Sequence, residues 1–231
     1  MIYVTGDMHG EFERFEDPEL KKLKDGDYLI ICGDFGFVWD RTEAAQKILY
    51  KISRKKFYTL FIDGTHENFD LLENYQLEPF AGGEAHHIMG NLYHLLRGRI
   101  YEIEGKKIFT FGGGESKDKD IRISQGTWWP QEMPSTEEIS RCTPALESVN
   151  REVDYIITHE PPASLKRYMS GYNLSNTNVL GNFLDDIAKS VRYDKWFFGS
   201  VHIDRQFSDK HFAMFTSVLA ANQESKRRFW R

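Results

Sequence analysis

The chain has 231 residues, of which 40% are hydrophobic and 14% aromatic, and it carries a formal charge of −5 at pH 7. This length and composition suffice for one α/β domain with a sizeable core, so we expect residues 1–231 to form a single domain. The acidic balance argues against a general nucleic-acid or membrane-surface binder, because both functions need a basic face.

Two sequence features favour a cytoplasmic protein. Cys32 and Cys142 are the only cysteines. The first falls in an expected buried strand and the second in an expected helix, so neither a disulfide nor a thiolate zinc site is predicted. The first residues enter an apolar strand directly, so we expect no signal peptide, and no apolar run approaches the roughly 20 residues that span a bilayer. The basic tail, residues 226–231, is interpreted as a surface segment and not as a nucleic-acid site.

The first apolar run ends at two metal-binding side chains. Residues 2–4 form a short β-branched and aromatic run that Thr5-Gly6 interrupts, and Asp7 and His9 follow. A carboxylate oxygen and an imidazole nitrogen together suit manganese, iron or zinc better than calcium or magnesium. A single Asp-x-His after a strand is more often an ordinary turn, so the ends of the other strands decide between these interpretations.

Four later apolar runs end in the same way, with Asp or His just after the run and usually Gly beside it. The runs are 27–32, 58–62, 154–158 and 195–198, and they lead to Asp34, to Asp63 with His66, to His159 and to His202. Ligands in open α/β sheets bind beyond the carboxyl ends of the strands, so we expect these side chains to converge. Five unrelated polar loops are the alternative, which the repetition disfavours.

The ordered motifs resemble those of the calcineurin-like metallophosphoesterases. They are Gly6-Asp7-Met8-His9-Gly10, Gly33-Asp34, Gly64-Thr65-His66-Glu67, Thr158-His159 and Gly199-Ser200-Val201-His202. The resemblance reaches from the first strand to about Phe215. It implies the α/β (α+β) class with four α/β/β/α layers, in which two mixed sheets pack face to face and helices lie outside. It also implies metal-dependent hydrolysis of phosphate esters by a metal-bound hydroxide.

The resemblance further implies a role for each motif residue. The first metal ion would be bound by Asp7, His9 and His202, the second by His159, and Asp34 would bridge both. His66 would stand beside the leaving group, so His66 and Asp34 are the expected catalytic residues. Mn²⁺ is the expected metal, with iron, zinc and nickel as alternatives. The substrate would be a small phosphorylated molecule, with a nucleotide among the candidates.

Two positions depart from the family pattern, which has Asn in place of Thr65 and His in place of Ser200, both directed at the second metal. That site keeps Asp34 and His159 as strong ligands, together with two hydroxyl groups that coordinate weakly. We therefore expect one tight and one weak metal site. A rival hypothesis is an impaired protein of the same fold that acts as a binding or scaffold module, but retention of His66 favours the enzyme.

Helix patterns alternate with the strands. A first helix is predicted over 11–24, with a cap and restart at Asp17-Pro18. Capping-box spacings begin two others, from Asp40 with Glu43 through Ile52, and from Ser135 with Glu138 through about Val149. A further helix is predicted over 175–193.

Short strands from residue 92 onward are predicted to begin a second sheet. They are 92–95, 99–103 and 107–111, and Glu104-Gly105 joins the last two as a hairpin. A second hairpin of 203–207 and 211–216 would complete this sheet. The nearby His86, His87 and His94 are interpreted as surface or structural residues, with a place in the cleft left open for His87.

The long connection over 116–129 combines cations and aromatic residues after a run of glycines. Long loops often have a functional role, so Arg122, Trp128 and Trp129 are candidate substrate-binding residues. A solvated loop explains the same pattern equally well. Asp63 and Glu67 also have two interpretations, either as groups that orient metal ligands or as solvated loop charges.

Overall fold

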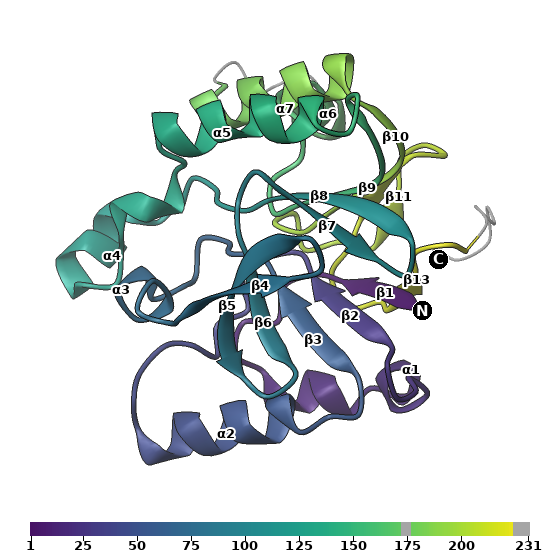
Figure 1. Ribbon diagram of the computed structural model, residues 1–231. Coiled ribbons are helices and arrows are strands. Elements are labelled where there is room, and N and C mark those ends of the chain that lie inside the picture. Colours follow the sequence, from purple (N-terminus) through teal and green to yellow (C-terminus); the bar gives the residue numbers. More distant parts are fainter. Residues whose placement is uncertain (172–176, 224–231) are drawn as a thin grey trace.

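A computed structural model describes residues 1–171 and 177–223. Two sheets pack face to face, and helices cover the outer face of each sheet (Figure 1). The first sheet is covered by α2 (Glu43–Ser53), and the second by α5 (Thr136–Glu147), α6 (Ala163–Met169) and α7 (Val179–Ser190). The expected α/β/β/α sandwich is therefore confirmed.

The first sheet has seven strands within the described residues, in the order β13-β1-β2-β3-β6-β5-β4. They are β1 (Ile2–Thr5), β2 (Tyr28–Ile31), β3 (Tyr58–Phe61), β4 (Leu77–Phe80), β5 (Gly83–Met89), β6 (Leu92–Leu95) and β13 (Leu219–Ala220). β1, β2, β3 and β6 run parallel, and the remaining strands pair antiparallel at the two sides. The carboxyl ends of the parallel strands therefore lie at one edge.

The second sheet has six strands in the described part of the chain, in the order β11-β12-β10-β9-β8-β7. They are β7 (Arg99–Ile103), β8 (Lys106–Phe111), β9 (Glu152–Thr158), β10 (Arg192–Phe198), β11 (Arg205–Gln206) and β12 (His211–Ala213). β8, β9, β10 and β12 run parallel, whereas β7 and β11 are antiparallel to their neighbours. Both sheets are mixed, as the resemblance implies.

Side chains from both sheets fill the space between them. Leu60 of β3, Ile157 of β9 and Phe197 of β10 are fully buried in this central layer. Two outer layers pack the sheets against their helices, and Leu49 and Leu184 contribute from α2 and α7. Strands buried on both faces read as continuous apolar runs, which explains why the sequence located most of them.

Helix starts follow local capping chemistry, with one correction. Asp17 accepts a hydrogen bond from the backbone N–H of Glu19 at 2.7 Å, so the predicted 11–24 helix is divided into a 3₁₀ helix (Phe12–Glu16) and α1 (Pro18–Lys21). α5 begins with the predicted Ser135–Glu138 capping box. The N-cap of α2 is Thr42 and not Asp40, because the Thr42 hydroxyl accepts from the N–H of Ala45 at 3.2 Å.

The division of strands between the sheets also differs from expectation. β6 belongs to the first sheet, where it pairs with β3, and the second sheet begins only at β7. β4 and β5 were not predicted. The Glu104-Gly105 hairpin is confirmed, with φ of 54° and 69° at the two residues. The helix predicted over 175–193 is too long, because α7 covers Val179–Ser190 and residues 192–193 already belong to β10. Residues 175–176 of that prediction and the whole 226–231 tail lie outside the described residues.

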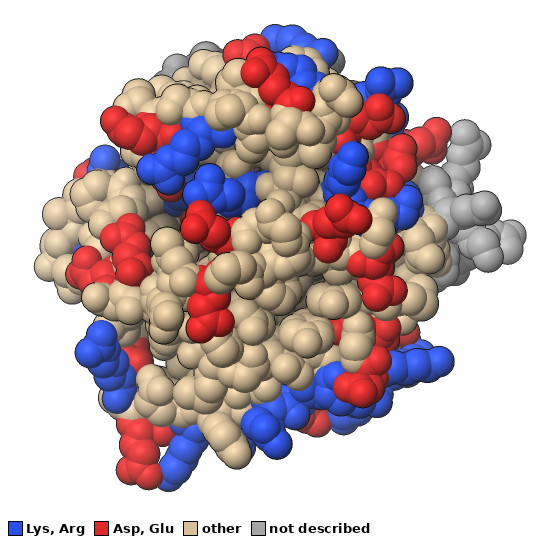
Figure 2. All heavy atoms as spheres, in the orientation of Figure 1, with Lys and Arg blue, Asp and Glu red and all other residues tan. Residues whose placement is uncertain are grey.

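Charged groups of both signs are interspersed on the face shown in Figure 2. This distribution agrees with the acidic but mixed composition of the chain. Within the described residues, no helix combines the length and apolar character needed to cross a membrane.

Candidate metal centre

The predicted ligands come together where the two sheets meet. Asp7 and His9 follow β1, and Asp34 follows β2, on the first sheet; His159 and His202 follow β9 and β10 on the second. Residues almost two hundred positions apart in the chain are thus brought into one cluster by strand ends that share an edge.

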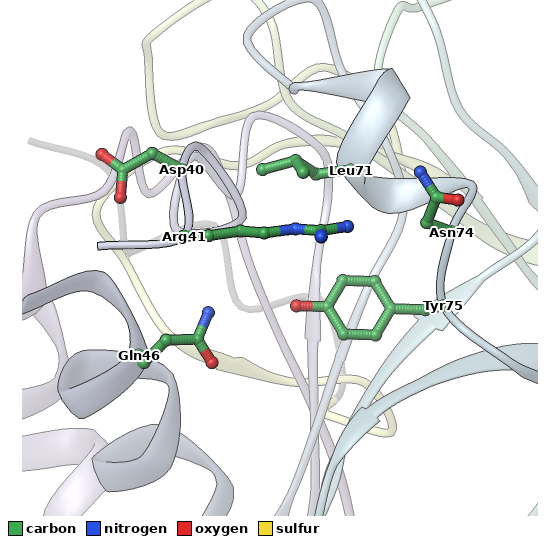
Figure 3. A pocket seen from close by; sticks show the side chains of 6 residues that line it. All are labelled: Asp40, Arg41, Gln46, Leu71, Asn74 and Tyr75. Atoms are coloured by element: carbon green, nitrogen blue, oxygen red, sulfur yellow. The ribbon is translucent and has the colours of Figure 1, made fainter. Parts of the chain in front are cut away.

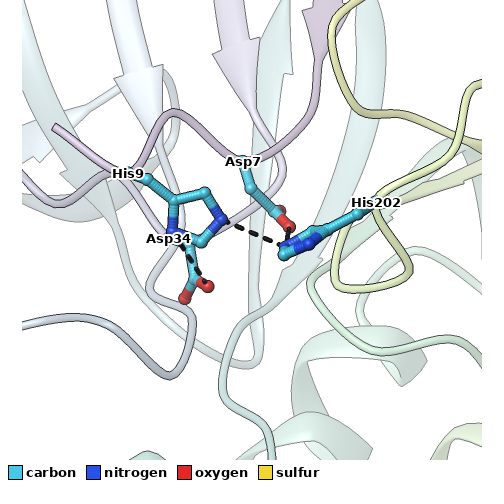
Figure 4. Close-up of side chains that lie close together, drawn as sticks. All are labelled: Asp7, His9, Asp34 and His202. Carbon is cyan, nitrogen blue, oxygen red and sulfur yellow. Dashed lines mark hydrogen bonds and ion pairs between the residues drawn. The ribbon is translucent and has the colours of Figure 1, made fainter. Parts of the chain in front are cut away.

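Four of these residues form a compact group that can hold a metal ion (Figure 4). One ligand atom from each of Asp7, His9, Asp34 and His202 lies within 4.8 Å of all the others. His9 Nε2 is 3.0 Å from His202 Nε2, and His202 Nε2 is 3.1 Å from Asp7 Oδ2. Two carboxylates and two imidazoles form a donor set typical of transition-metal sites.

Burial supports a cation at this group. Asp7 and Asp34 are 0% and 2% exposed, and burying carboxylates is costly unless positive charge compensates them. The facing Nε2 atoms of His9 and His202 cannot both bear a proton at their short separation. A shared cation satisfies both nitrogens and both carboxylates, so the residues present fit a divalent metal.

His159 and His9 each lie near a different carboxylate oxygen of Asp34. The Nδ1–H of His159 donates to the carbonyl oxygen of Cys32 at 3.0 Å, so Nε2 is the ring nitrogen that would be available to a metal ion. That Nε2 lies 3.6 Å from Asp34 Oδ1, while His9 Nδ1 lies 3.8 Å from Asp34 Oδ2. Asp34 therefore has one oxygen toward each imidazole, an arrangement suited to a carboxylate that bridges two ions.

Neighbouring charges in the cluster shift the pKa values of Asp34 and His159. Burial alone would raise the pKa of Asp34, but the charge of His159 and the hydrogen bond from His66 hold it well below its ordinary range. Burial likewise opposes the charged form of His159, yet Asp34 and Asp7 raise the pKa of His159 to about 10. The carboxylates are thus ionised and attract positive charge.

The two departures from the family pattern contact the cluster through their backbones. The N–H of Thr65 donates to Asp34 Oδ1 at 2.6 Å, and the N–H of Ser200 donates to Asp7 Oδ2 at 3.0 Å. The Thr65 hydroxyl is 3.4 Å from Asp34 Oδ1. These amide contacts do not depend on the side chain, so both residues orient predicted metal ligands whatever the donor strength of their own hydroxyl groups.

His66 stands next to the cluster with a half-buried side chain. Its Nδ1 is 2.8 Å from Asp34 Oδ2, and its backbone N–H donates to Asp34 Oδ1 at 2.8 Å. The hydrogen bond with Asp34 raises the pKa of His66 above its ordinary value. His66 is not part of the four-residue metal group.

Glycines and unusual backbone conformations allow these side chains to converge. A Cβ at Gly33, Gly64 or Gly199 would overlap His159, Asp34 or Asp7, respectively. His9, Asp34, Ser200 and His202 all have positive φ, between 44° and 66°. Non-glycine residues in this region are uncommon and concentrate at functional sites, where the surrounding structure holds them.

The two acidic residues of the β3 loop are buried supports and not solvated charges. Glu67 accepts from the N–H of Phe35 at 2.7 Å, which fixes the loop that bears Asp34. Asp63 forms a buried ion pair with Arg97, whose Nε lies 2.9 Å away, and contacts His94 Nε2 at 3.2 Å.

The histidines before and on β6 are structural, as expected. His94 and His86 are both buried, with their Nδ1 atoms 3.0 Å apart. His87 of β5 pairs with Glu78 of β4 at 3.1 Å, and it does not line the cleft that opens beside the four-residue metal group.

Arg14 is a support that the sequence did not reveal. Its guanidinium donates to the carbonyl oxygens of Asp7 and Phe215, the latter at 2.6 Å. The ring of Phe215 in turn stacks on His202, with centroids 4.9 Å apart. A lone cation on a short 3₁₀ helix has no distinctive sequence signal, so only the folded chain identifies this role.

A cleft of about 540 Å³ opens beside the metal group, and the long connection reaches it through residues 115–118. Arg122 is turned inward instead: it is 4% exposed and pairs with Glu132 at 2.6 Å. Trp129 packs edge-on against Trp39, and Trp128 lies under the Lys119 ammonium at 4.4 Å. Among the described residues, the cleft lining includes none of the three predicted substrate-binding side chains.

A separate hollow of about 260 Å³ lies between the start of α2 and the helix α3 (Phe69–Leu72). Arg41 extends across it toward Leu71, Asn74 and Tyr75 (Figure 3). None of the described metal-binding groups lies there. The metal cleft is therefore the better candidate for chemistry.

The fold and the cluster together define an α/β protein with two mixed sheets and a candidate metal centre at their strand ends. The sequence model of the calcineurin-like phosphoesterase family matches residues 1–204. The chain therefore belongs to this family and is a phosphoester hydrolase.

A solved structure of a phosphopantetheinyl hydrolase from Mycobacterium tuberculosis is similar to this chain, with 14% identity and a TM-score of 0.44. The match covers 93% of this chain and 87% of that chain. No curated protein sequence matches the chain significantly.

Proposed function

We propose that this protein hydrolyses small phosphorylated molecules at the cluster described above, with a nucleotide among the candidate substrates. The observation that carries the proposal is the group formed by Asp7, His9, Asp34 and His202, whose ligand atoms lie within 4.8 Å of one another. Mixed oxygen and nitrogen donors favour Mn²⁺, with iron, zinc or nickel as alternatives. Two free, buried cysteines fit a reducing cytoplasm.

The residues of the centre have distinct tasks in this proposal. Divalent ions would neutralise the phosphoryl oxygens and lower the pKa of the attacking water. Asp34 holds both parts of the centre together, because its two oxygens face His159 and His9. His66, held by Asp34 at 2.8 Å, donates a proton to the leaving oxygen, a role typically worth about a hundredfold or more.

Removing the His66 imidazole should separate substrates by their leaving groups. His66→Ala should slow hydrolysis of alkyl phosphates by about a hundredfold while sparing activated aryl esters, which need little proton donation. Steady-state kinetics on both ester types measures the difference. Bound metal should not fall, because His66 lies outside the metal group. An equal loss on both esters would contradict the general-acid role.

The ligand set should produce two sites of unequal affinity. Four strong ligands would be available to the first ion, whereas Asp34 and His159 are the strong ligands that would be available to the second. Affinity for divalent ions depends on ligand number and charge. We therefore expect one tightly bound ion per chain after purification, and activity that rises as further Mn²⁺ is added.

Restoring the family ligands should strengthen the second site. Thr65→Asn combined with Ser200→His should raise bound metal toward two ions and remove the need for excess Mn²⁺, with Ser200→His giving most of the gain. Histidine tolerates the positive φ of 66° at position 200 better than most residues. Elemental analysis measures the stoichiometry. Two tightly bound ions in the wild type would overturn the argument.

The proposed function is tested with p-nitrophenyl phosphate and bis(p-nitrophenyl) phosphate. The purified protein is stripped with a chelator and assayed with manganese, nickel, zinc or magnesium. Hydrolysis that returns only with metal supports the proposal, and the preferred ester separates monoesterase from diesterase activity. A protein that binds metal but hydrolyses neither these esters nor a nucleotide panel would be a binding module instead.

A further inference from the structure

The metal cleft is lined by more than metal ligands. Met169 at the end of α6, with Val201 and Ile203 after β10, contributes apolar surface, and Ile203 is 40% exposed. Residues 115–118 contribute a polar segment. At about 540 Å³, the cleft has room for the organic part of an ester as well as its phosphate.

Most cations near the cleft are already paired. Lys166 lies 2.7 Å from the carboxylate of Glu160, which is 6% exposed. Arg122 is committed to Glu132 at 2.6 Å. Among the described residues that line the cleft, Lys117 is the cation with no carboxylate within 4.0 Å. Its ammonium is therefore free to pair with an anion from outside.

A buried network holds the segment that bears Lys117. The Ser116 hydroxyl accepts from Arg122 Nη1 at 2.7 Å and donates to the carboxylate of Glu132. The backbone N–H of Gly114 donates to the carbonyl oxygen of Glu132 at 2.9 Å. Ser116 is thus anchored from one side while Lys117, the next residue, lines the cleft. Such preorganisation lowers the entropy lost when a ligand binds.

We propose that Lys117 binds a second anionic group of the substrate, and that Arg122 and Glu132 are positioning residues for it. The substrates are then organic phosphate esters that carry a carboxylate or second phosphate beyond an apolar portion. That portion contacts Met169, Val201 and Ile203. This inference rests on the proposed phosphoesterase function and narrows its substrate class.

A pair of isosteric substrates tests the charge directly. 4-Carboxyphenyl phosphate has one cleavable ester and a second anion, and 4-carbamoylphenyl phosphate replaces that anion with a neutral group of equal size. The corresponding meta isomers place the second group at a different distance from the phosphate. The wild type should favour one carboxylate isomer over its carboxamide by about tenfold in kcat/KM, the worth of one charge-assisted hydrogen bond. The preference should lie mainly in KM.

Substitutions at Lys117, Arg122 and Glu132 test which residues cause the preference for the carboxylate substrate. Lys117→Met should bring the carboxylate-to-carboxamide ratio close to one, and Lys117→Arg should retain most of it. Arg122→Met should also lower the ratio, because the segment loses its anchor; Glu132→Gln is the alternative if Arg122→Met does not fold. Lys47→Met is the matched control, since Lys47 lies on α2 and pairs with Glu43 at 2.6 Å. It should keep the wild-type ratio.

The outcome separates this inference from the proposed function. Calorimetric titration with the two corresponding arylphosphonates measures the same ratio without turnover, on metal-loaded protein. Hydrolysis without a charge preference in the wild type, or a preference that survives Lys117→Met, would overturn the subsite and leave the phosphoesterase proposal intact. A charge preference in phosphonate binding without hydrolysis of any ester would instead support the subsite and contradict the proposed function.

Discussion

Asp34→Asn should abolish hydrolysis and weaken metal binding. The Asp34 carboxylate supplies one oxygen toward His9 and one toward His159, and an amide offers a single neutral oxygen in its place. We expect kcat/KM to fall by at least about a thousandfold, equivalent to roughly 4 kcal/mol of transition-state stabilisation. Steady-state kinetics at saturating Mn²⁺ and elemental analysis measure the two effects.

The matched control is Asp25→Asn, which changes an exposed carboxylate outside the cluster. It should leave activity and metal content at wild-type values. Circular dichroism should show both variants folded, since an amide oxygen at position 34 can still accept from the backbone N–H groups of Thr65 and His66. Substantial activity in Asp34→Asn protein would mean that Asp34 does not bridge the centre.

Arg97→Met should cause the largest loss of stability. Arg97 and Asp63 are 7% and 2% exposed, and removing one partner of a buried pair costs about 3–5 kcal/mol because the other charge stays uncompensated. For a chain of this size that loss corresponds to a fall of about 10 °C in Tm. Thermal unfolding of the metal-free protein measures it. The double variant Arg97→Met/Asp63→Asn should lose less than the sum of the single losses.

Acidification should reduce the contribution of this pair. Burial would raise the pKa of Asp63, but Arg97 and His94 outweigh it and hold the pKa well below the ordinary value. A carboxylate with a lowered folded-state pKa stabilises the protein above its unfolded-state pKa of about 3.9, and this contribution is lost as pH falls toward the folded-state value. The difference between wild type and Arg97→Met should therefore be full at pH 7 and shrink below about pH 4.

Arg99→Met controls for loss of an arginine from the same region. Arg99 pairs with Glu84 at 3.1 Å near the surface, and exposed pairs contribute only about 0–1 kcal/mol. A loss as small for Arg97→Met as for Arg99→Met would show that the buried pair is not a main source of stability.

The Asp63–Arg97 pair also helps to hold the loop beside the metal centre in place. Asp63 opens the loop that contains Thr65 and His66, and its carbonyl oxygen accepts from the N–H of Gly113 after β8. Arg97 lies between β6 of the first sheet and β7 of the second. The Asp63–Arg97 ion pair and the Asp63–Gly113 hydrogen bond therefore join the two sheets beside the metal centre.

Much of the centre could be predicted from the sequence because its signals are local. An apolar run followed by Gly and then by Asp or His predicts both a strand and a metal-binding side chain at its end. Five such runs in order predicted Asp7, His9, Asp34, His159 and His202. The hairpin at Glu104-Gly105 and the Ser135–Glu138 capping box are equally local, since the residues that make them are at most three positions apart.

Long-range contacts decided the rest. Residues 92–95 read as a strand, but their pairing with β3 depends on which edge is free when the sheets assemble. The sequence places Arg122 as a cation on a polar loop. Its side chain turns inward in the structure, because Glu132, Ser116 and Thr127 supply the ion-pair and hydrogen-bond partners of its guanidinium. A sequence pattern specifies which chemical group a residue carries and whether its backbone is extended or helical. The direction of a side chain depends on partners that only the folded chain brings within hydrogen-bonding distance.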